Sequence, residues 1–456
     1  MLRAGVAAYT NLPKSYTIIP MKRPVFIYVF ALSLLLTALP GFSQTAGAVD
    51  GAGRSRGDYL TVKLAVMGPG DELYFWWGHL ALIIDDAVTG TSRFYDYGLF
   101  SFKNAHFFTN FLMGRLLYSV GVSPAEANYR VYRNSNRDIT LYTLDLPAST
   151  KEEIRRFVEN NVLPENRDYL YHHFKNNCVT PVLNIIDTAT GGQFRAEYGE
   201  APGRYTIRQH VRRHTWFNPS FDWFLNFMMG QDIDKPTTVW EEMFLPQELG
   251  NRINEFTYTD VNGRERRLVS SVEVLNRAVD RPAILDVPRK QWPRALALGM
   301  VTAMLLCGVY ALRRRRPAAG RIILGSVQAL LGLFFGVVGL ALFFMTFFTN
   351  HDYTYHNINL LYINPLLFAA VPWGIMMAAG KGQGALNAEG RPAVRSPGWY
   401  LQVLWTYVFF GGIATMVIKL LPAFYQQNQV TLAMVLPAAL VLSRIPRWVL
   451  TRRKPV

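Results

Sequence analysis

The sequence His79-Leu80-Ala81-Leu82-Ile83-Ile84 is a continuous apolar run that predicts a buried β-strand. Before it, apolar and polar side chains alternate over residues 59–67, which predicts another strand, and Gly68-Pro69-Gly70 ends that strand. After a turn at residues 85–90, residues 92–98 predict a further strand that pairs back as a hairpin. These segments together predict an antiparallel sheet.

The segments that follow predict helices packed with this sheet. Residues 104–117 carry an amphipathic stripe, which predicts a helix whose apolar side is packed in the core or, alternatively, faces acyl chains. Residues 138–146 predict a strand and residues 151–161 a helix. Another helix is predicted from Asn177 or Cys178 through Ile186, and Asn262-Gly263 predicts a hairpin. The fold class expected for this part is therefore α+β.

The C-terminal part is apolar and predicts an all-α domain of about five transmembrane helices. The five segments lie at about 295–312, 322–348, 360–380, 399–420 and 430–443, the last being short for a span. Thirteen of the 15 Lys and Arg residues after Trp292 fall in alternate loops, which the positive-inside rule assigns to the cytoplasm. The first helix then runs from outside to inside, so the α+β part lies outside.

The net charge of +15 does not indicate nucleic-acid binding. From Pro293 onward there are 15 basic and 2 acidic residues, whereas the first 292 residues carry a net charge of only +2. The basic excess therefore belongs to membrane topology rather than to phosphate contacts. No nucleic-acid partner is expected.

The N-terminus has the pattern of an export signal. Met21-Lys22-Arg23 precedes an apolar run from Val25 to Leu39, and small residues precede Gln44. This predicts a signal peptide at 21–43, with an uncleaved anchor helix as the alternative. We expect an exported domain at 44–250, a hairpin and linker at 251–292 and a transmembrane domain at 293–456.

A single cysteine in the exported part is the sharpest chemical clue. Cys178 has no partner there for a disulfide, because Cys307 lies in a predicted membrane helix. A thiolate nucleophile needs a helix N-terminus or a nearby imidazole, and His79 at the start of a strand is the candidate base. Asp96 on the neighbouring strand is the candidate that orients the ring. Alternatively, Cys178 and His79 are core residues and Asp96 is a turn carboxylate.

Other polar residues are weaker candidates. Tyr95 and Tyr97 are offset by one residue from Asp96, so they are expected to point to the opposite face of the sheet. Asn177 precedes the cysteine at the predicted helix start. For Asn166-Arg167, and for the nearby Tyr169 and Tyr171, substrate binding and helix packing are both open.

The outer loop between the second and third membrane segments is rich in polar residues. His351, Asp352 and His356 lie in it, and the loop is expected beside the exported domain, either lining an entrance for lipid or substrate or serving as a solvated interfacial loop. A metal site formed by these three side chains is a weak alternative, since no diagnostic ligand spacing is present. No metal is predicted.

Six segments, in this order, resemble the Lnb-type family of bacterial envelope proteins. They are Gly68-Pro69-Gly70-Asp71-Glu72-Leu73-Tyr74, Trp77-Gly78-His79, Tyr95-Asp96-Tyr97-Gly98, Asn166-Arg167, Asn176-Asn177-Cys178-Val179-Thr180 and the loop from Asn357 to Pro365. Members have an N-terminal periplasmic domain and a C-terminal membrane part, and the resemblance implies lipoprotein N-acyltransferase activity. The order of histidine before cysteine is also similar to the permuted papain-like fold of lecithin:retinol acyltransferase relatives, which move acyl chains through a cysteine thioester.

On that resemblance Cys178 is the nucleophile, His79 the base and Asp96 the orienting residue, and Tyr95, Tyr97, Asn166, Arg167 and Asn177 are substrate-binding candidates. The implied partners are lipoproteins and membrane phospholipid at the inner membrane, without a metal or organic cofactor. Two other classes remain open from the residues. One is a papain-like peptidase or amidase of the cell envelope, and the other is a non-enzymatic envelope scaffold in which Cys178 is merely buried.

Overall fold

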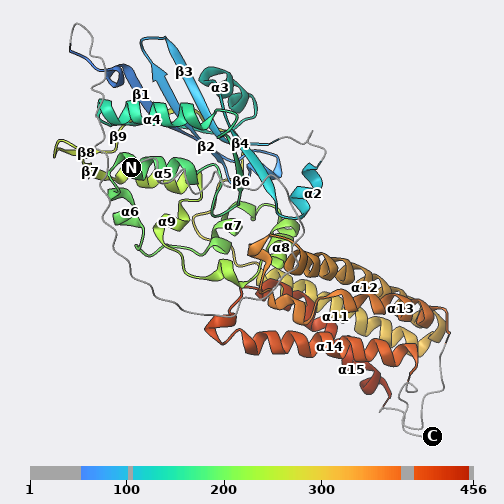
Figure 1. The fold of residues 1–456 in the computed structure, drawn as a ribbon. Coiled ribbons are helices and arrows are strands. Elements are labelled where there is room, and N and C mark those ends of the chain that lie inside the picture. The colour runs from blue at the N-terminus through green and yellow to red at the C-terminus, as the bar shows by residue number, and fades with distance from the viewer. Residues whose placement is uncertain (1–52, 101–105, 382–394, 451–456) are drawn as a thin grey trace, which may run out of the picture.

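The computed structural model describes residues 53–100, 106–381 and 395–450. An α+β domain built on an antiparallel sheet is followed by a bundle of long apolar helices, and the two lie end to end (Figure 1). The predicted fold class, α+β followed by membrane helices, is confirmed. The predicted signal peptide at 21–43 lies outside the described residues.

The sheet has seven strands, in the order β6-β4-β3-β2-β1-β5-β9, and every neighbouring pair is antiparallel. The predicted strands at 59–67, 79–84, 92–98 and 138–146 are all present. The strands are β1 (Leu60–Met67), β2 (His79–Asp86), β3 (Thr91–Leu99), β4 (Leu116–Pro124), β5 (Ile139–Leu144), β6 (Asp168–Tyr171) and β9 (Val269–Asn276).

Helices cover both faces of this sheet. On one face α3 (Ala125–Asn134) packs on the small and apolar side chains of β1, β2 and β3. On the other face α4 (Ala148–Asn161) and α5 (Thr180–Ala189) bury the larger core (Figure 1). Strand alternation explains the division, because successive side chains of each strand point to opposite faces.

The predicted helix over 104–117 is wrong in extent. Of its described residues, 106–117, only those of α2 (Phe107–Leu112) are helical, and Leu116 already begins β4. Gly114 ends the helix with a φ of +69°, and an added Cβ there would lie 2.8 Å from the Asn350 carbonyl carbon. The apolar side is also not in the core, since Phe108 is 72% exposed. The helix expected from Asn177 or Cys178 begins instead at Thr180.

The rest of the exported domain consists of short elements below the sheet. The predicted hairpin around Asn262-Gly263 is confirmed as β7 and β8. The short elements of this domain are α6 (Gln193–Tyr198), α7 (Ile207–Thr215), α8 (Pro219–Met228), α9 (Val239–Glu242), α10 (Pro246–Glu255), β7 (Thr257–Thr259), β8 (Glu265–Arg267) and the 3₁₀ helices η1 (Arg56–Tyr59), η2 (Leu73–Phe75) and η3 (Gln231–Asp234).

Among the described residues of the membrane part, four stretches are long and apolar enough to span a bilayer: Trp292–Arg315, Pro317–Phe348, Ile358–Ala378 and Pro397–Ile418. The fifth predicted segment belongs to α15, whose apolar part, Gln429–Ser443, is shorter and packs on α11 and α14. The elements are α11 (Trp292–Arg315), α12 (Pro317–Phe348), η4 (Asp352–Thr354), η5 (Ile358–Leu361), η6 (Pro365–Ala369), α13 (Ala370–Ala378), α14 (Pro397–Ile418), η7 (Pro422–Phe424) and α15 (Gln429–Leu450).

Helix α8 joins the two domains. Its last residues, Phe227 and Met228, are buried in the same core as the membrane helices. The Asn357 side chain donates to the Phe227 carbonyl at 2.8 Å, and the Gln426 side chain donates to the Met229 carbonyl at 3.1 Å. Because buried polar groups need partners, these amide contacts fix how the domains meet.

A buried ion pair stabilises this junction. The Arg208 guanidinium of α7 is fully buried and donates to Asp234 at 2.8 Å and to the carbonyls of Asn226, Met229 and Gly230. The second Asp234 oxygen accepts from the backbone N–H that precedes α15, at residue 427, at 3.0 Å. One carboxylate thus connects α7, η3 and the membrane part.

We therefore expect Asp234→Ala to lower the free energy of unfolding by about 3–5 kcal/mol, because it leaves the Arg208 charge buried and unpaired. The measurement is thermal unfolding of the full chain in detergent. Asp232→Ala is the matched control, since Asp232 lies on the same 3₁₀ helix but is one-third exposed and pairs with exposed partners. It should cost less than about 1 kcal/mol. Equal effects of the two variants would contradict the role given to Asp234.

Candidate active site

Cys178 lies in a tight turn between β6 and α5. A bridge between His172 and Asn176 closes the loop before it. The Asn177 side chain then accepts from the Val179 N–H at 2.8 Å and donates to the Phe244 carbonyl at 2.7 Å. Asn177 therefore fixes the start of α5 and holds Cys178 just before it, where the side chain is 8% exposed.

His79 and Asp96 form a direct pair on neighbouring strands. The His79 Nε2 and Asp96 Oδ1 atoms are 2.8 Å apart. The register of β2 and β3 explains the contact. Asp96 of β3 lies opposite Ala81 of β2. Ala81 is two residues after His79, so all three side chains lie on the same face of the sheet. The Asp96 carboxylate accepts from Nε2–H, which leaves Nδ1 of His79 as the nitrogen that exchanges a proton with another group.

Gly98 is where Cys178 meets this pair. A Cβ added to Gly98 would lie 3.3 Å from His79 Cε1, 3.6 Å from Cys178 Cβ and 3.9 Å from Asp96 Oδ1. Cys178 packs with the core on the α5 side of the sheet, whereas His79 stacks on Tyr132 of α3 on the other side. The Cys178 thiol and the His79 imidazole thus come from opposite faces and approach each other at a position without a side chain.

The charges around the His79 ring favour its protonated form. Burial alone would lower the pKa of His79, but Tyr132, Asp96 and Cys178 around the ring raise that pKa well above its usual value of 6.5. A protonated imidazole beside a thiol is the arrangement that favours a thiolate. The site therefore has the electrostatics of a cysteine–histidine nucleophile.

A second cation lies behind the histidine, which the sequence did not predict. Arg137 is 1% exposed and its guanidinium lies between the rings of Phe75 and Tyr132, at 4.4 Å and 4.7 Å from their centroids. Its Nε donates to the Gly68 carbonyl at 2.9 Å. Phe75, Arg137, Tyr132 and His79 thus form one stack, which fixes one side of the imidazole ring. The bond from Arg137 to the Gly68 carbonyl explains why Gly68 lies in a motif near the site.

Tyrosines of β4 and β6 surround the cysteine on its other side. Tyr118 and Tyr171 stack with ring centroids 4.2 Å apart. Burial, and then the neighbouring Cys178, raises the pKa of Tyr118 to about 12 and the pKa values of Tyr169 and Tyr171 well above their usual value. The buried Tyr169 hydroxyl has no hydrogen-bond partner among the described residues.

The loop that carries Cys178 is attached to the outer loop of the membrane domain. Asp352 accepts from His172 Nε2 at 2.7 Å and from Lys175 Nζ at 2.5 Å. The Tyr353 ring packs against His173 and Phe174, with centroids 5.6 Å from each. The outer loop lies beside the exported domain as expected, and it contacts the cysteine loop directly.

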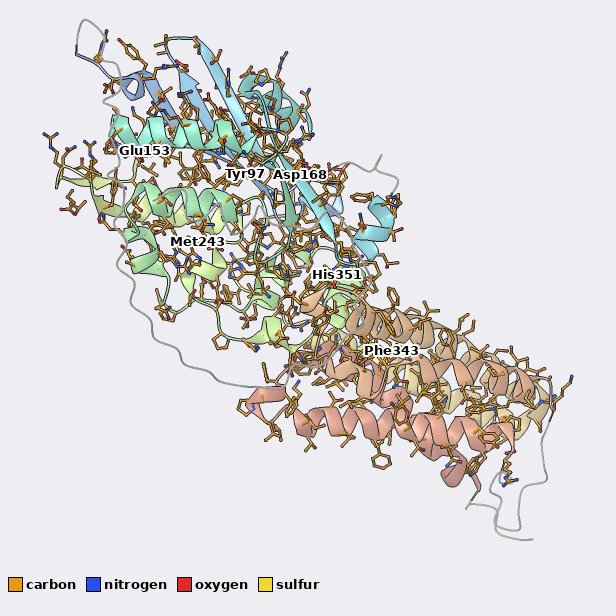
Figure 2. All side chains as sticks on the ribbon, in the orientation of Figure 1. Tyr97, Glu153, Asp168, Met243, Phe343 and His351 are labelled. Carbon is orange, nitrogen blue, oxygen red and sulfur yellow. The ribbon has the colours of Figure 1, made fainter. Side chains whose placement is uncertain are left out.

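The three polar residues considered for a metal site have separate partners. His351, at the junction of the two domains (Figure 2), lies 3.0 Å from the Phe111 carbonyl through Nε2 and 2.7 Å from the Tyr353 hydroxyl through Nδ1. Asp352 bonds the cysteine loop, and His356 lies 2.9 Å from Asp232. In the described part of the chain no three potential ligands gather at one point. The loop's polar residues thus connect the domains.

The remaining predicted residues have partners of their own or are exposed. Tyr95 and Tyr97 are 1% and 2% exposed in the core on the α5 side, and Asn161 donates to the Tyr97 hydroxyl at 3.0 Å. Asn166 and Arg167 lie in the turn after α4, where Asn166 donates to a carbonyl of that helix and Arg167 is exposed. Their role in substrate binding stays a prediction.

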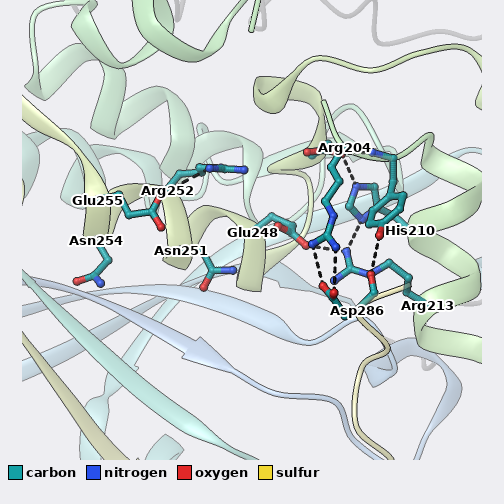
Figure 3. Close-up of a pocket in the computed structure, with 11 residues that line it drawn as sticks. Arg204, His210, Arg213, Glu248, Asn251, Arg252, Asn254, Glu255 and Asp286 are labelled. Atoms are coloured by element: carbon teal, nitrogen blue, oxygen red, sulfur yellow. Dashed lines mark hydrogen bonds and ion pairs between the residues drawn. The ribbon is translucent and has the colours of Figure 1, made fainter. Parts of the chain in front are cut away.

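A polar pocket of about 270 Å³ lies elsewhere, among residues of α7, α9 and α10 (Figure 3). Its charged side chains pair with one another: Arg204 with Asp286 at 2.8 Å, Arg213 with Glu248 at 2.8 Å. The buried His210 lies 3.0 Å from Glu242 at its wall. Because these charges are already compensated and none of the predicted residues lines it, the pocket is not part of the Cys178 site.

The Asp96 charge gives a testable pH dependence. Because His79 has a raised pKa, the stability contributed by its protonated form is fully present below pH 6.5 and is lost as the pH rises through the folded value. Asp96→Asn removes one of the charges that raise the His79 pKa. The His79 imidazolium should therefore lose its proton at a lower pH than in the unmodified protein. We expect iodoacetamide to alkylate Cys178 more slowly in Asp96→Asn, over the pH range in which that variant has lost the imidazolium and the unmodified protein keeps it.

The control is Asp85→Asn in the same hairpin. Asp85 lies 2.7 Å from Lys63 and is not in contact with the His79 ring, so the alkylation profile should not change. An Asp96→Asn profile identical to that of the unmodified protein would contradict the assigned charge coupling.

Two sequence profiles match the chain, and both describe parts of one family. The profile of the Lnb N-terminal periplasmic domain matches residues 53–213, and that of the Lnb transmembrane domain matches residues 291–382. They cover more than half of the chain, in the order of the two structural domains, and the first contains Cys178, His79 and Asp96. No curated protein and no solved structure matches. The chain therefore belongs to the Lnb-type family, as a membrane protein with a periplasmic N-terminal domain.

Proposed function

We propose that this protein is a cysteine-dependent lipoprotein N-acyltransferase on the outer face of the inner membrane. The observation that carries the proposal is the meeting of Cys178 with the His79–Asp96 pair around Gly98, in a loop attached to the membrane domain. The family supports it, and so does the order of histidine before cysteine, which is that of permuted papain-like acyltransferases.

The first half-reaction transfers an acyl chain to the enzyme. The Cys178 thiolate attacks the ester carbonyl of a membrane lipid or of a lipoprotein's diacylglyceryl group, and the C–S bond forms as the C–O bond breaks. His79, protonated at Nδ1, gives its proton to the leaving alkoxide. The product is an acyl thioester on Cys178 and a free hydroxyl on the donor.

The second half-reaction forms the amide. The α-amine of the N-terminal cysteine of a lipoprotein attacks the thioester, and neutral His79 takes the proton released from the amine. The C–S bond breaks, and Cys178 returns as thiolate beside protonated His79. Atoms and charges balance over the cycle without any further reactant.

The negative oxygen that develops in both steps needs donors close to Cys178. Asn177 already bonds the Val179 N–H and, at 3.4 Å, the Thr180 N–H. In the described part of the chain no group accepts from the Cys178 N–H, which is therefore the backbone donor we assign. The buried, unpartnered Tyr169 hydroxyl is the second donor that the geometry favours.

Access from the membrane supports a lipid substrate. The α2 side chains Phe108, Phe111 and Leu112 are 72%, 46% and 52% exposed, and this helix contacts the outer membrane loop through the Phe111 carbonyl. An exposed apolar surface next to membrane-spanning helices fits the headgroup and acyl boundary. This surface is where we expect the acyl chains of the substrate to enter.

The test is mass spectrometry of lipoprotein N-termini from cells that lack this protein and are complemented with unmodified or Cys178→Ala protein. We expect N-acylated termini only with the unmodified protein. Free N-termini in the deletion strain that Cys178→Ala restores to N-acylated termini would reject the thioester. Identical N-termini in every strain would reject lipoprotein acylation as the function.

A further inference from the structure

A second, apolar cavity lies in the membrane domain, under the opposite side of α8 from the active site. It has a volume of about 600 Å³, and its walls are α8, α11, α12, α14 and α15. On α8, Trp223 lines the cavity, whereas Phe217 just before that helix and Phe221 pack against Trp76 of the catalytic domain, with centroids 4.8 Å and 5.2 Å away. A single helix thus separates the cavity from the segment that carries His79.

The cavity extends from the outer end of the bundle into its middle. Val430 and Ala439 of α15 both line it, and nine residues of helix span about 13 Å. That is nearly half of a hydrocarbon core about 30 Å thick. Leu298 and Phe334 also line the cavity but are 56% and 49% exposed, so it is open toward the surrounding lipid.

The one charged side chain among the lining residues lies at the outer mouth of the cavity. Ser220, Gln291 and Arg294 line this end, and among the described residues Arg294 has no acidic partner. The alternating charge pattern places Arg294 on the outer side, at the level of the lipid headgroups. A cation at the mouth of an apolar cavity is complementary to an anionic headgroup on an acyl chain.

The lining also contains donors that the protein does not satisfy. The indole N–H groups of Trp223 and Trp405 are buried and have no acceptor among the described residues, and Trp405 is only 2% exposed. Trp223 lies on α8 with Ser220, toward the mouth, and its ring stacks on Phe334. A buried N–H without an acceptor is unfavourable, which indicates an occupant that brings one.

We propose that this cavity binds one glycerophospholipid of the outer leaflet. An acyl chain lies between α11, α12, α14 and α15, an ester carbonyl accepts from the Trp223 indole, and the phosphate pairs with Arg294. Binding does not depend on the thiol, because none of Cys178, His79 and Asp96 lines the cavity.

The experiment is native mass spectrometry of the full chain, delipidated in detergent and then supplied with 1-palmitoyl-2-oleoyl-phosphatidylglycerol. It is done on the unmodified protein and on Cys178→Ala, so that a failure of acyl transfer does not affect the result. Ala295→Trp fills the mouth. Ala297→Trp is the matched control on the same helix, because Ala297 is exposed and does not line the cavity.

We expect one retained phospholipid, a loss of affinity of at least about tenfold with Ala295→Trp, and no change with Ala297→Trp. Arg294→Gln should weaken phosphatidylglycerol about tenfold but leave diacylglycerol binding unchanged. Ala438→Trp, on the α15 wall, replaces Ala295→Trp if that variant does not fold. No retained lipid, equal binding by the two tryptophan variants, or displacement of the lipid by inorganic phosphate alone would overturn the proposal.

Discussion

Cys178→Ala is expected to abolish acyl transfer by the purified protein and to leave its fold intact. Loss of the nucleophile in a cysteine or serine mechanism lowers the rate on the order of 10⁶-fold. The thiol is small and 8% exposed, so its removal should lower the free energy of unfolding by only about 1 kcal/mol. The measurements are acyl transfer to a lipopeptide and the intact mass of the protein after incubation with donor lipid.

The intact mass separates the thioester from other chemistry. The unmodified protein should gain the mass of one acyl group, which hydroxylamine removes, and Cys178→Ala should gain none. Cys307→Ala is the matched control, because Cys307 lies exposed on α11, outside the active site, and should react normally. Transfer that persists in Cys178→Ala would contradict the nucleophile, and an acyl group found on Cys307 would contradict the site.

Gly98→Ala is expected to lower acyl transfer by about tenfold to 10²-fold, although it adds only a methyl group. The new Cβ would lie 3.3 Å from His79 Cε1, so the imidazole must shift by a few tenths of an ångström, and it would lie 3.6 Å from Cys178 Cβ, which is an ordinary contact. Because a misplacement of about 1 Å between reacting groups costs about 10²-fold in rate, this smaller shift sets the lower part of the expected range. The φ of +150° at this residue adds backbone strain of about 1–3 kcal/mol.

Gly90→Ala separates the effect of backbone strain from the effect of steric crowding by the added methyl group. Gly90 also has a positive φ, +64°, and lies at the turn before the same strand, but an added Cβ there has nothing within 4 Å. It should lower stability by about 1–2 kcal/mol without lowering transfer measured on the folded protein. If both glycine variants keep full activity after correction for folding, Gly98 is not the meeting point of the catalytic groups.

The sequence predicted the parts of the fold that depend on local pattern. The strands at β1, β2, β3 and β5 follow from alternation and from the apolar run at His79. The segment from Phe107 to Leu117 shows where pattern fails: its apolar spacing is helical, but the Gly114 turn divides it into a short helix and a strand. That turn is fixed by contact with Asn350, which is 236 residues away in the chain and invisible to local spacing.

The candidate site was predictable as a set of residue types but not as an arrangement. A lone exported cysteine, an upstream histidine and a neighbouring carboxylate indicate the chemistry, and strand register indicates that Asp96 shares a face with His79. Arg137 and Tyr132 were not predictable, because they reach His79 only when α3 folds across the sheet. Nothing in the sequence shows that Cys178 comes from the opposite face.

The contact between Asp352 and the cysteine loop bears on how this protein is studied and inhibited. A truncated, water-soluble fragment that ends before Trp292 would lack the carboxylate that holds His172 and Lys175, and also the ring of Tyr353 that packs on the same loop. Compounds selected against such a fragment would be selected for binding to a cysteine loop that lacks its contacts with the membrane domain. Screening is therefore best done on the intact chain in a bilayer mimetic, where the Cys178 loop keeps its contacts with the membrane domain.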